Sequence, residues 1–231
     1  TGTTNVLIGC GAGNKITTGG KNTAVGSGAG TKITTGCKNI AIGANGPSGS
    51  ADCTVIIGQA AGNDKVQSQT ILIGAAAGNC LAGANNTAVG SSALRCADKD
   101  GSESDSNTAI GEDTMCGAKC VNQNTAVGSQ ALRCAVSASN IVALGHQAAK
   151  SAFCQAGTLD RYNTVVGANA MQNVVSGSRN VALGFCAGRT SAAGNIISSD
   201  NSIFIGSHAC GLNASSTNEI VIGDGATGCG N

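Results

Sequence analysis

The stretch Asn22-Thr23-Ala24-Val25-Gly26 decides the fold, because variants of it recur along the whole 231-residue chain. Its closing Gly returns thirteen times, at positions 9, 26, 43, 58, 74, 90, 111, 128, 145, 167, 184, 206 and 223. Three residues after this Gly, Ala occupies eleven of the thirteen positions. A period near 17 residues is too short for a helical hairpin, and a β-branched block between Asn and Gly is typical of a strand. The sequence therefore predicts an all-β parallel β-solenoid, or β-roll, of about thirteen coils with roughly 17 residues in each, as a single repeat domain over residues 1–231.

Each block also predicts which side chains face outward. The residue three before the closing Gly is Thr, Val or Ile, and the residue immediately before the Gly is Val, Ile or Leu. These two rows are two residues apart, so they share one face of the strand, which we assign to the core. The row between them then points outward, and because it is apolar as well, we expect another molecule to cover it. This predicted assembly face consists of Leu7, Ala24, Ala41, Ile56, Leu72, Ala88, Ala109, Ala126, Ala143, Val165, Ala182, Phe204 and Val221.

Self-association is therefore the main functional expectation from the residues. The alternative is that Ala is harmless on a solvent face and that the larger side chains are tolerated singly, because folded surfaces carry much apolar area.

The cysteines predict disulfides between coils. Twelve Cys without a metal-type grouping favour an oxidising compartment, and hence a protein outside the cell, on a cell or virion surface. Residues at similar offsets from successive closing Gly residues lie about one strand spacing apart, within reach of a disulfide. The candidate pairs are Cys37 with Cys53, Cys80 with Cys96, Cys116 with Cys134, and Cys186 with Cys210. The alternative is that these residues are free and pack as small apolar side chains.

Three longer repeats predict loops on the flank of the solenoid, where insertions often bind partners. The candidate binding residues in two of them are Asp98, Asp100, Glu103, Asp105, Asp160, Arg161 and Tyr162. Solvated loops without a partner are the alternative.

Composition excludes several classes of function. Charged residues make up 11% of the chain, the formal net charge is +1, and the aromatic residues are three Phe and one Tyr. The charges form no basic stripe and the aromatics are too few to stack bases, so nucleic-acid binding is not expected. No run approaches the roughly 20 apolar residues of a membrane span, so membrane insertion is not expected.

Catalytic and metal-binding patterns are also missing from the sequence. Cys116 and Cys120 have no His nearby to complete a zinc site. Glu112 and Asp113 are adjacent and would point apart in a strand, which makes a poor acid/base pair. We therefore expect a protein that is not an enzyme, with no catalytic residues, no metal and no cofactor.

The run NTAVGSGAGTKITTGCKNIAIG, residues 22–43, resembles the head repeats of trimeric autotransporter adhesins and the related repeats of phage and giant-virus tail fibres. Later copies are NTAVGSSAL (86–94), NTAVGSQAL (124–132) and NEIVIGDGATG (218–228). The resemblance implies a left-handed parallel β-roll, three chains around a common axis, and a surface that binds a host receptor or glycan. It also implies a segment of a longer fibre.

The function expected from these observations is that of a non-enzymatic extracellular structural or adhesive β-solenoid, a homotrimeric fibre or adhesin segment. Two alternatives stay open: an ice-binding β-solenoid, and a subunit of a disulfide-linked sheath or filament.

Overall fold

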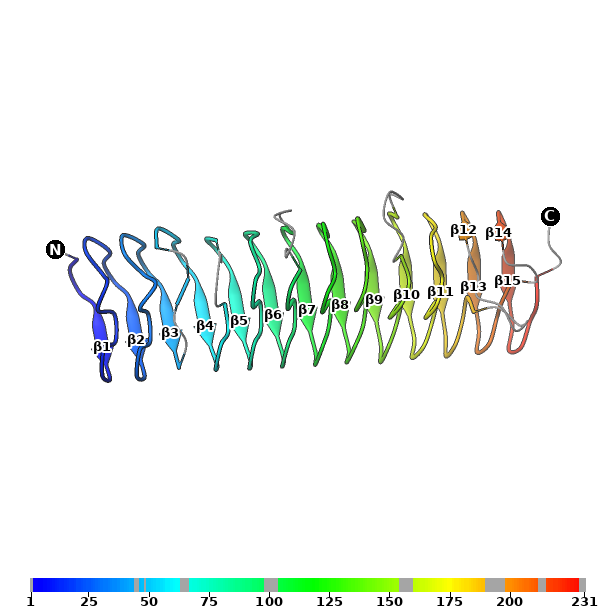
Figure 1. Cartoon of the computed structure of the whole chain (residues 1–231). Helices are drawn as coiled ribbons and strands as arrows, with labels where there is room; N and C mark the ends of the chain where they lie inside the picture. Colours follow the sequence, from blue (N-terminus) through cyan, green and yellow to red (C-terminus); the bar gives the residue numbers. More distant parts are fainter. Residues whose placement is uncertain are drawn as a thin grey trace. The chain divides into compact units, whose positions relative to one another are not determined.

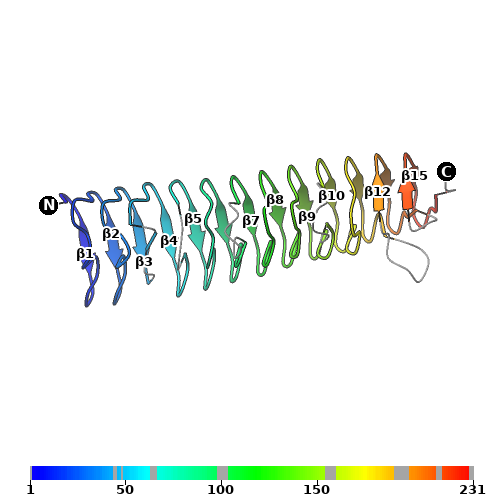
Figure 2. The same cartoon turned by 45° about the horizontal axis from the view of Figure 1, so that its top comes forward.

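A computed structural model of the chain describes residues 2–43, 46–47, 49–62, 67–97, 104–153, 160–189, 198–211 and 215–228. The chain divides into two compact units, Thr1–Asp113 and Thr114–Asn231. Each unit is a stack of coils whose strands lie side by side (Figure 1), and a second view shows the same succession of strands (Figure 2). The prediction of an all-β parallel β-solenoid is confirmed.

Every coil contributes one strand of three residues to a parallel sheet. In the first unit these strands are β1 (Val6–Ile8), β2 (Thr23–Val25), β3 (Ile40–Ile42), β4 (Val55–Ile57), β5 (Ile71–Ile73), β6 (Thr87–Val89) and β7 (Thr108–Ile110). In the second unit they are β8 (Thr125–Val127), β9 (Val142–Leu144), β10 (Thr164–Val166), β11 (Val181–Leu183), β13 (Ile203–Ile205) and β15 (Ile220–Ile222). A second, two-stranded parallel sheet joins β12 (Ser198–Asp200) to β14 (Ser215–Thr217).

The strands pair at identical positions of the repeat. Val6 lies opposite Thr23, Leu7 opposite Ala24 and Ile8 opposite Val25, and equivalent positions of the repeat pair in the same way in the following coils. The solenoid has about 11 turns of about 17 residues, fewer than the thirteen repeats of the sequence.

A left-handed backbone corner precedes every strand. The residue five before the closing Gly has a φ between 54° and 62° in all thirteen repeats. Side chains as different as Lys21, Cys53 and Tyr162 occupy this corner. Since the left-handed region normally selects Gly or Asn, the corner must be imposed by the stacking of the coils and not by local residue preference.

Steric crowding explains why Gly closes the repeat. At Gly58, where φ is +131°, a Cβ would lie 2.5 Å from the carbonyl oxygen of Gly74 in the next coil. At Gly9, Gly58, Gly74 and Gly90 the added Cβ would lie 2.4–2.5 Å from the next coil, so at these positions consecutive coils approach too closely for any side chain, whereas Gly43 has no atom within 4 Å of such a Cβ.

The predicted orientation of the strand faces is wrong. The middle residue of each strand points into the coil, and it is fully buried from Ala24 to Phe204. From the second coil onward the residues expected on the outside are thus core residues, namely Ala24, Ala41, Ile56, Leu72, Ala88, Ala109, Ala126, Ala143, Val165, Ala182, Phe204 and Val221, whereas the equivalent Leu7 in the first coil is 43% exposed. The bulkier rows on either side face outward, because the interior of the coil is too thin to hold them.

The core is thin, as the sizes of the side chains that face each other across it show. A Cβ on Gly78 would lie 2.6 Å from the side chain of Leu72, so a large strand residue faces a Gly four positions after the closing Gly. In the coil of Ala126 the arrangement is reversed, because the residue at that later position is a fully buried Leu132. In these two coils, dense packing leaves room for one large side chain of the pair.

A column of buried Asn side chains ties the coils together. Asn22 accepts a hydrogen bond from the amide of Asn39 at 2.9 Å and donates one to the carbonyl of Gly36 at 2.9 Å. Asn163 in the second unit repeats the arrangement with the amide of Asn180 and the carbonyl of Gly177. The opening Asn of the repeat is thus a structural rung that satisfies buried backbone groups.

Candidate functional site

The most distinctive surface of both units is the outer side of the main sheet. We define the outward face as the first and third residues of β1 to β7 in the first unit, and of β8 to β11, β13 and β15 in the second. All of these residues are Thr, Val, Ile or Leu, and none is charged. Ile40, Ile71 and Ile73 are each more than one-third exposed although they lie in interior coils. The outward face is therefore a regular apolar surface without a covering layer in the described residues.

The repeat fixes the geometry of this face. Side chains along a strand on the same side are two residues apart, and equivalent side chains of adjacent coils are about 4.8 Å apart. Seven strands in the first unit thus carry two parallel rows of branched side chains over roughly 30 Å. Branched side chains at fixed spacing present a flat, rigid surface because few of their rotamers are accessible.

The cysteines do not form the predicted disulfides. All ten cysteines that the structure describes are free thiols, which includes both members of each candidate pair. In the third pair, Cys116 is buried whereas Cys134 is exposed. In the last pair, the amide of His208 bonds to the carbonyl of Phe185, which places His208 and not Cys210 opposite Cys186.

The two N-terminal candidate pairs differ in whether their cysteines lie directly opposite each other. The amide of Cys53 bonds to the carbonyl of Cys37, which sets Cys53 opposite the residue after Cys37. The amide of Cys96 bonds to the carbonyl of Asn79 at 2.7 Å, so Cys96 does lie opposite Cys80, where both thiols are half-buried. Adjacent offsets in the sequence therefore do not guarantee facing side chains.

Two of the predicted binding residues have structural roles. The carboxylate of Asp105 accepts the amide of Ala84 in the preceding coil at 2.7 Å. Asp160, only 2% exposed, accepts the amide of Gly177 in the following coil at 2.7 Å. Both carboxylates therefore complete backbone hydrogen bonding between coils. Asp98, Asp100 and Glu103 lie outside the described residues.

Arg161 and Tyr162 are exposed, as expected for binding residues. Tyr162 is 59% exposed and occupies the left-handed corner of its coil. Arg179 occupies the corner of the next coil and is held by a hydrogen bond from its Nε to Asn201. We call the residues five before each closing Gly the corner column, and in this column the fold does not restrict the type of side chain. The sequence analysis missed this column because no residue type recurs in it.

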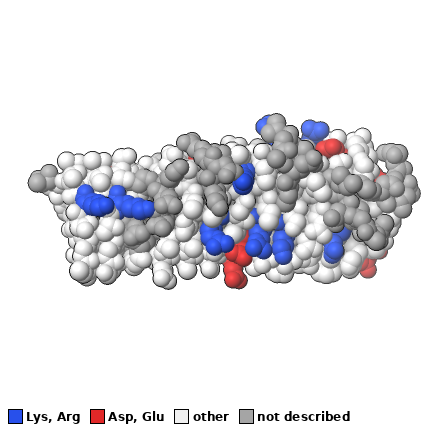
Figure 3. Space-filling model, viewed as in Figure 1, with Lys and Arg blue, Asp and Glu red and all other residues white. Residues whose placement is uncertain are grey.

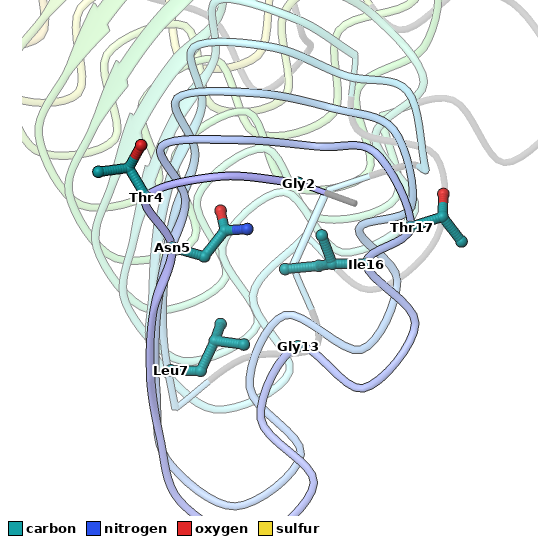
Figure 4. Close-up of a pocket in the computed structure, with 7 residues that line it drawn as sticks. All are labelled: Gly2, Thr4, Asn5, Leu7, Gly13, Ile16 and Thr17. Carbon is teal, nitrogen blue, oxygen red and sulfur yellow. The ribbon is translucent and has the colours of Figure 1, made fainter.

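A cavity of about 460 Å³ lies at the first coil, lined by Gly2, Thr4, Asn5, Leu7, Gly13, Ile16 and Thr17. Figure 4 shows that Asn5, Leu7 and Ile16 point into the coil, whereas Thr4 and Thr17 point away from it. Within the described part of the chain, no group of three or more His, Cys, Asp or Glu residues is placed to hold a metal ion. The residues described include no helix long and apolar enough to cross a membrane.

Neither the models of protein families nor the curated proteins contain a match to this sequence. The assignment of a function therefore rests on the fold and on the outward face.

Proposed function

We propose that the chain is a non-enzymatic structural solenoid that assembles laterally by burying the outward face against other copies of itself. The observation that carries this proposal is that the face is uncharged and consists mostly of Val, Ile and Leu. Contiguous exposed apolar patches are rare on monomeric proteins and mark interaction sites. Lateral association would remove the partly exposed Ile40, Ile42, Ile71 and Ile73 from water.

The proposed assembly has three chains and serves as a fibre or adhesin segment outside the cell. Three chains and a host receptor or glycan as partner are implied by the resemblance to adhesin heads and tail fibres. Because the described cysteines are free, disulfides no longer support an oxidising compartment. The extracellular location therefore rests on that resemblance alone. The exposed corner column that includes Tyr162 is the part of each coil best suited to carry receptor-binding side chains.

Sedimentation equilibrium tests the proposal with a pair of matched variants. Ile71→Lys places a charge in the outward face, whereas Gln69→Lys places the same charge at the exposed corner of the same coil. We expect trimers for the wild type and Gln69→Lys, and dissociated chains for Ile71→Lys with an unchanged circular dichroism spectrum. A monomeric wild-type protein at micromolar concentration would overturn lateral assembly, and polymers that fall apart only on adding reductant would indicate a sheath instead.

Ice binding is a second candidate, and the observed orientation of the strands favours it. The large residues Leu72 and Phe204 lie inside the coil, so they do not disturb the flatness of the outward face. Thermal hysteresis of the purified monomer would support this function, provided that Thr108→Lys on the face abolishes it and Ser106→Lys at the corner does not. Absence of hysteresis in the wild type would exclude it.

A further inference from the structure

The corner column of the second unit places six polar side chains in one line. The amide of Tyr162 donates to the carbonyl of Ser139, which sets Tyr162 opposite Asn140. The amide of Arg179 donates to the carbonyl of Arg161 at 2.9 Å, which sets Arg179 opposite Tyr162. Consecutive members of the column therefore lie about 4.8 Å apart. The six residues are Gln123, Asn140, Tyr162, Arg179, Asn201 and Asn218.

The side chains of the corner column point out of the coil, on the same side as the outward face. Figure 4 shows this for the corner residue Thr4, which points away from its coil, whereas the next residue, Asn5, points into it. The alternation continues into each strand, so the column lies beside the outer row that contains Thr164 and Val181. A line of polar side chains thus runs next to a line of branched, mostly apolar ones with the same spacing.

The middle of this column holds an aromatic ring next to a fixed guanidinium. Tyr162, the one tyrosine of the chain, is 59% exposed, and the fold does not need it because Lys21 and Cys53 fill the same position in other coils. Arg179 is exposed as well, and its Nε donates to Oδ1 of Asn201 at 2.6 Å. Since this bond uses Nε, the two terminal nitrogens of the guanidinium form a fork of donors that faces a ligand.

The acidic groups nearest to this pair are engaged with the backbone. The carboxylate of Asp160 accepts the amide of the neighbouring coil at 2.7 Å, and that of Asp200 accepts another such amide at 2.8 Å. Arg161, which precedes Tyr162 in the chain, is exposed like Arg179. Charged side chains are sparse on the face shown in Figure 3, so two exposed guanidiniums in adjacent coils are a local concentration of positive charge.

The ligand that fits this column carries carboxylates, hydroxyl groups and an apolar face. A guanidinium fork binds a carboxylate through two parallel hydrogen bonds. The side-chain amides of Asn140 and Asn218 both donate and accept, which suits hydroxyl groups. An exposed Tyr ring supplies rigid contact area for C–H groups at low cost in conformational entropy. A uronic acid has all three features, because its ring carbons form an apolar face and its hydroxyl groups and carboxylate lie at the rim.

We propose that the corner column of the second unit binds an acidic polysaccharide whose chain of uronic acids runs along the stack. A linear polymer with a repeated unit matches a line of side chains with a regular spacing. Tyr162 packs on one sugar ring, and Arg179 binds a carboxylate of the chain beside it. Asn140 and Asn218 bind hydroxyl groups on either side. This inference rests on the proposed adhesive function, since it names the class of ligand that the same column binds.

Isothermal titration calorimetry with polygalacturonate tests the proposal at an ionic strength of about 0.15 M. Two control polymers separate its parts: methyl-esterified polygalacturonate has the sugars without the charges, and polyglutamate has the carboxylates without the sugars. We expect both controls to bind at least about tenfold more weakly than polygalacturonate. Equal binding of polyglutamate would overturn sugar recognition and indicate an acidic peptide as ligand. Equal binding of the ester would overturn the role of the guanidiniums, and no binding of polygalacturonate would overturn the proposal as a whole.

Variants that copy other members of the corner column locate the site without disturbing the fold. Arg179→Gln introduces the residue found at Gln123, and Tyr162→Ser introduces the residue found at Ser106. With an unchanged circular dichroism spectrum, Arg179→Gln should weaken binding of polygalacturonate roughly tenfold or more. Tyr162→Ser should weaken it about threefold to tenfold, whereas Tyr162→Phe, which keeps the ring, should retain most of the affinity.

Arg133→Gln is the matched control, because it removes the same charge from the same unit at a position outside the column. We expect Arg133→Gln to bind polygalacturonate like the wild type. Equal losses in Arg133→Gln and Arg179→Gln would indicate general attraction between charges and would contradict a site at the column. Unchanged affinity in Arg179→Gln would contradict it as well.

The variant Ile71→Lys separates polysaccharide binding from lateral assembly. Ile71 belongs to the outward face of the first unit, whereas the site lies in the corner column of the second. We therefore expect Ile71→Lys to bind polygalacturonate with the affinity per chain of the wild type, although its chains are dissociated. Loss of binding in this variant would overturn a site built from one chain. A monomeric wild type that binds would overturn the lateral contact alone, and a wild-type trimer that does not bind would overturn the polysaccharide site alone.

Discussion

The two faces of the main sheet are both apolar, yet they differ in the size of their side chains. The inward face is mostly Ala, and its members are fully buried throughout the interior coils. The outward face is Thr, Val, Ile and Leu, and it remains partly exposed. The comparison teaches that volume decides which face is buried in a thin coil, because hydrophobicity alone would place the larger side chains inside.

The largest effect is expected where coils touch through backbone alone. In Gly128→Ala, the added Cβ would lie 2.6 Å from the carbonyl carbon of Gly145, and φ is +131°. Crowding together with strain should cost about 3 kcal/mol or more of the free energy of unfolding, measured by chemical denaturation. Gly223→Ala is the control, since φ is +134° but the nearest atom is 3.5 Å away, and it should show only the backbone strain, which is of order 1–3 kcal/mol and is common to both variants. Equal losses in the two variants would contradict the crowding argument.

Overfilling the inward face is expected to have the next largest effect. Ala126→Leu adds volume opposite the buried Leu132 and should destabilise the protein by about 2–3 kcal/mol. The double variant Ala126→Leu with Leu132→Gly copies the native pair Leu72 and Gly78, and it should recover most of that loss. Position 132 has a φ of 51°, so Gly is accommodated there without strain. A double variant no more stable than the single one would disprove volume matching across the core.

The polar rung beside the inward face should matter slightly less. Asn163→Ala leaves the amide of Asn180 and the carbonyl of Gly177 without their buried side-chain partner, at a cost of about 2 kcal/mol. Asn163→Thr is expected to cost less, because Thr54 fills the same position in another coil and is fully buried there. Hydrogen exchange at Asn180 would report the loss locally, and unchanged protection in Asn163→Ala would count against the rung.

The smallest effect on stability is expected on the outward face. Thr125→Val exchanges one half-exposed branched side chain for another of similar size and should change the free energy of unfolding by less than about 0.5 kcal/mol. A loss comparable to that of Ala126→Leu would mean that the outward face contributes to the fold of the single chain.

The sequence was sufficient to predict the fold class and the registration of its coils. The spacing of the closing Gly from position 9 to position 223 carries the period, and the block around Thr23 to Val25 marks the strand. Parallel stacking then places equivalent residues opposite each other, as Val6 and Thr23 are.

Three features escaped prediction for physical reasons. Which face of the strand points inward depends on the thickness of the coil. In the sequence, this thickness is indicated only by pairs such as Leu72 with Gly78 and Ala126 with Leu132. The carboxylates of Asp105 and Asp160 look like solvent-exposed loop charges in the sequence, but each accepts a backbone amide of a neighbouring coil. Whether two thiols face each other changes when the register shifts by one residue. Similar distances in sequence from the closing Gly are not accurate enough to predict this.

The left-handed corners before the strands have a consequence for how the chain folds. Each non-Gly corner is disfavoured by about 1 kcal/mol or more when its coil is alone, and hydrogen bonds to a neighbouring coil are needed to offset this. Nucleation therefore requires at least two coils to form together, whereas every later coil is added to a finished template. Folding should thus proceed by propagation along the stack, as in a one-dimensional zipper, with a rate set by the formation of the first stacked pair.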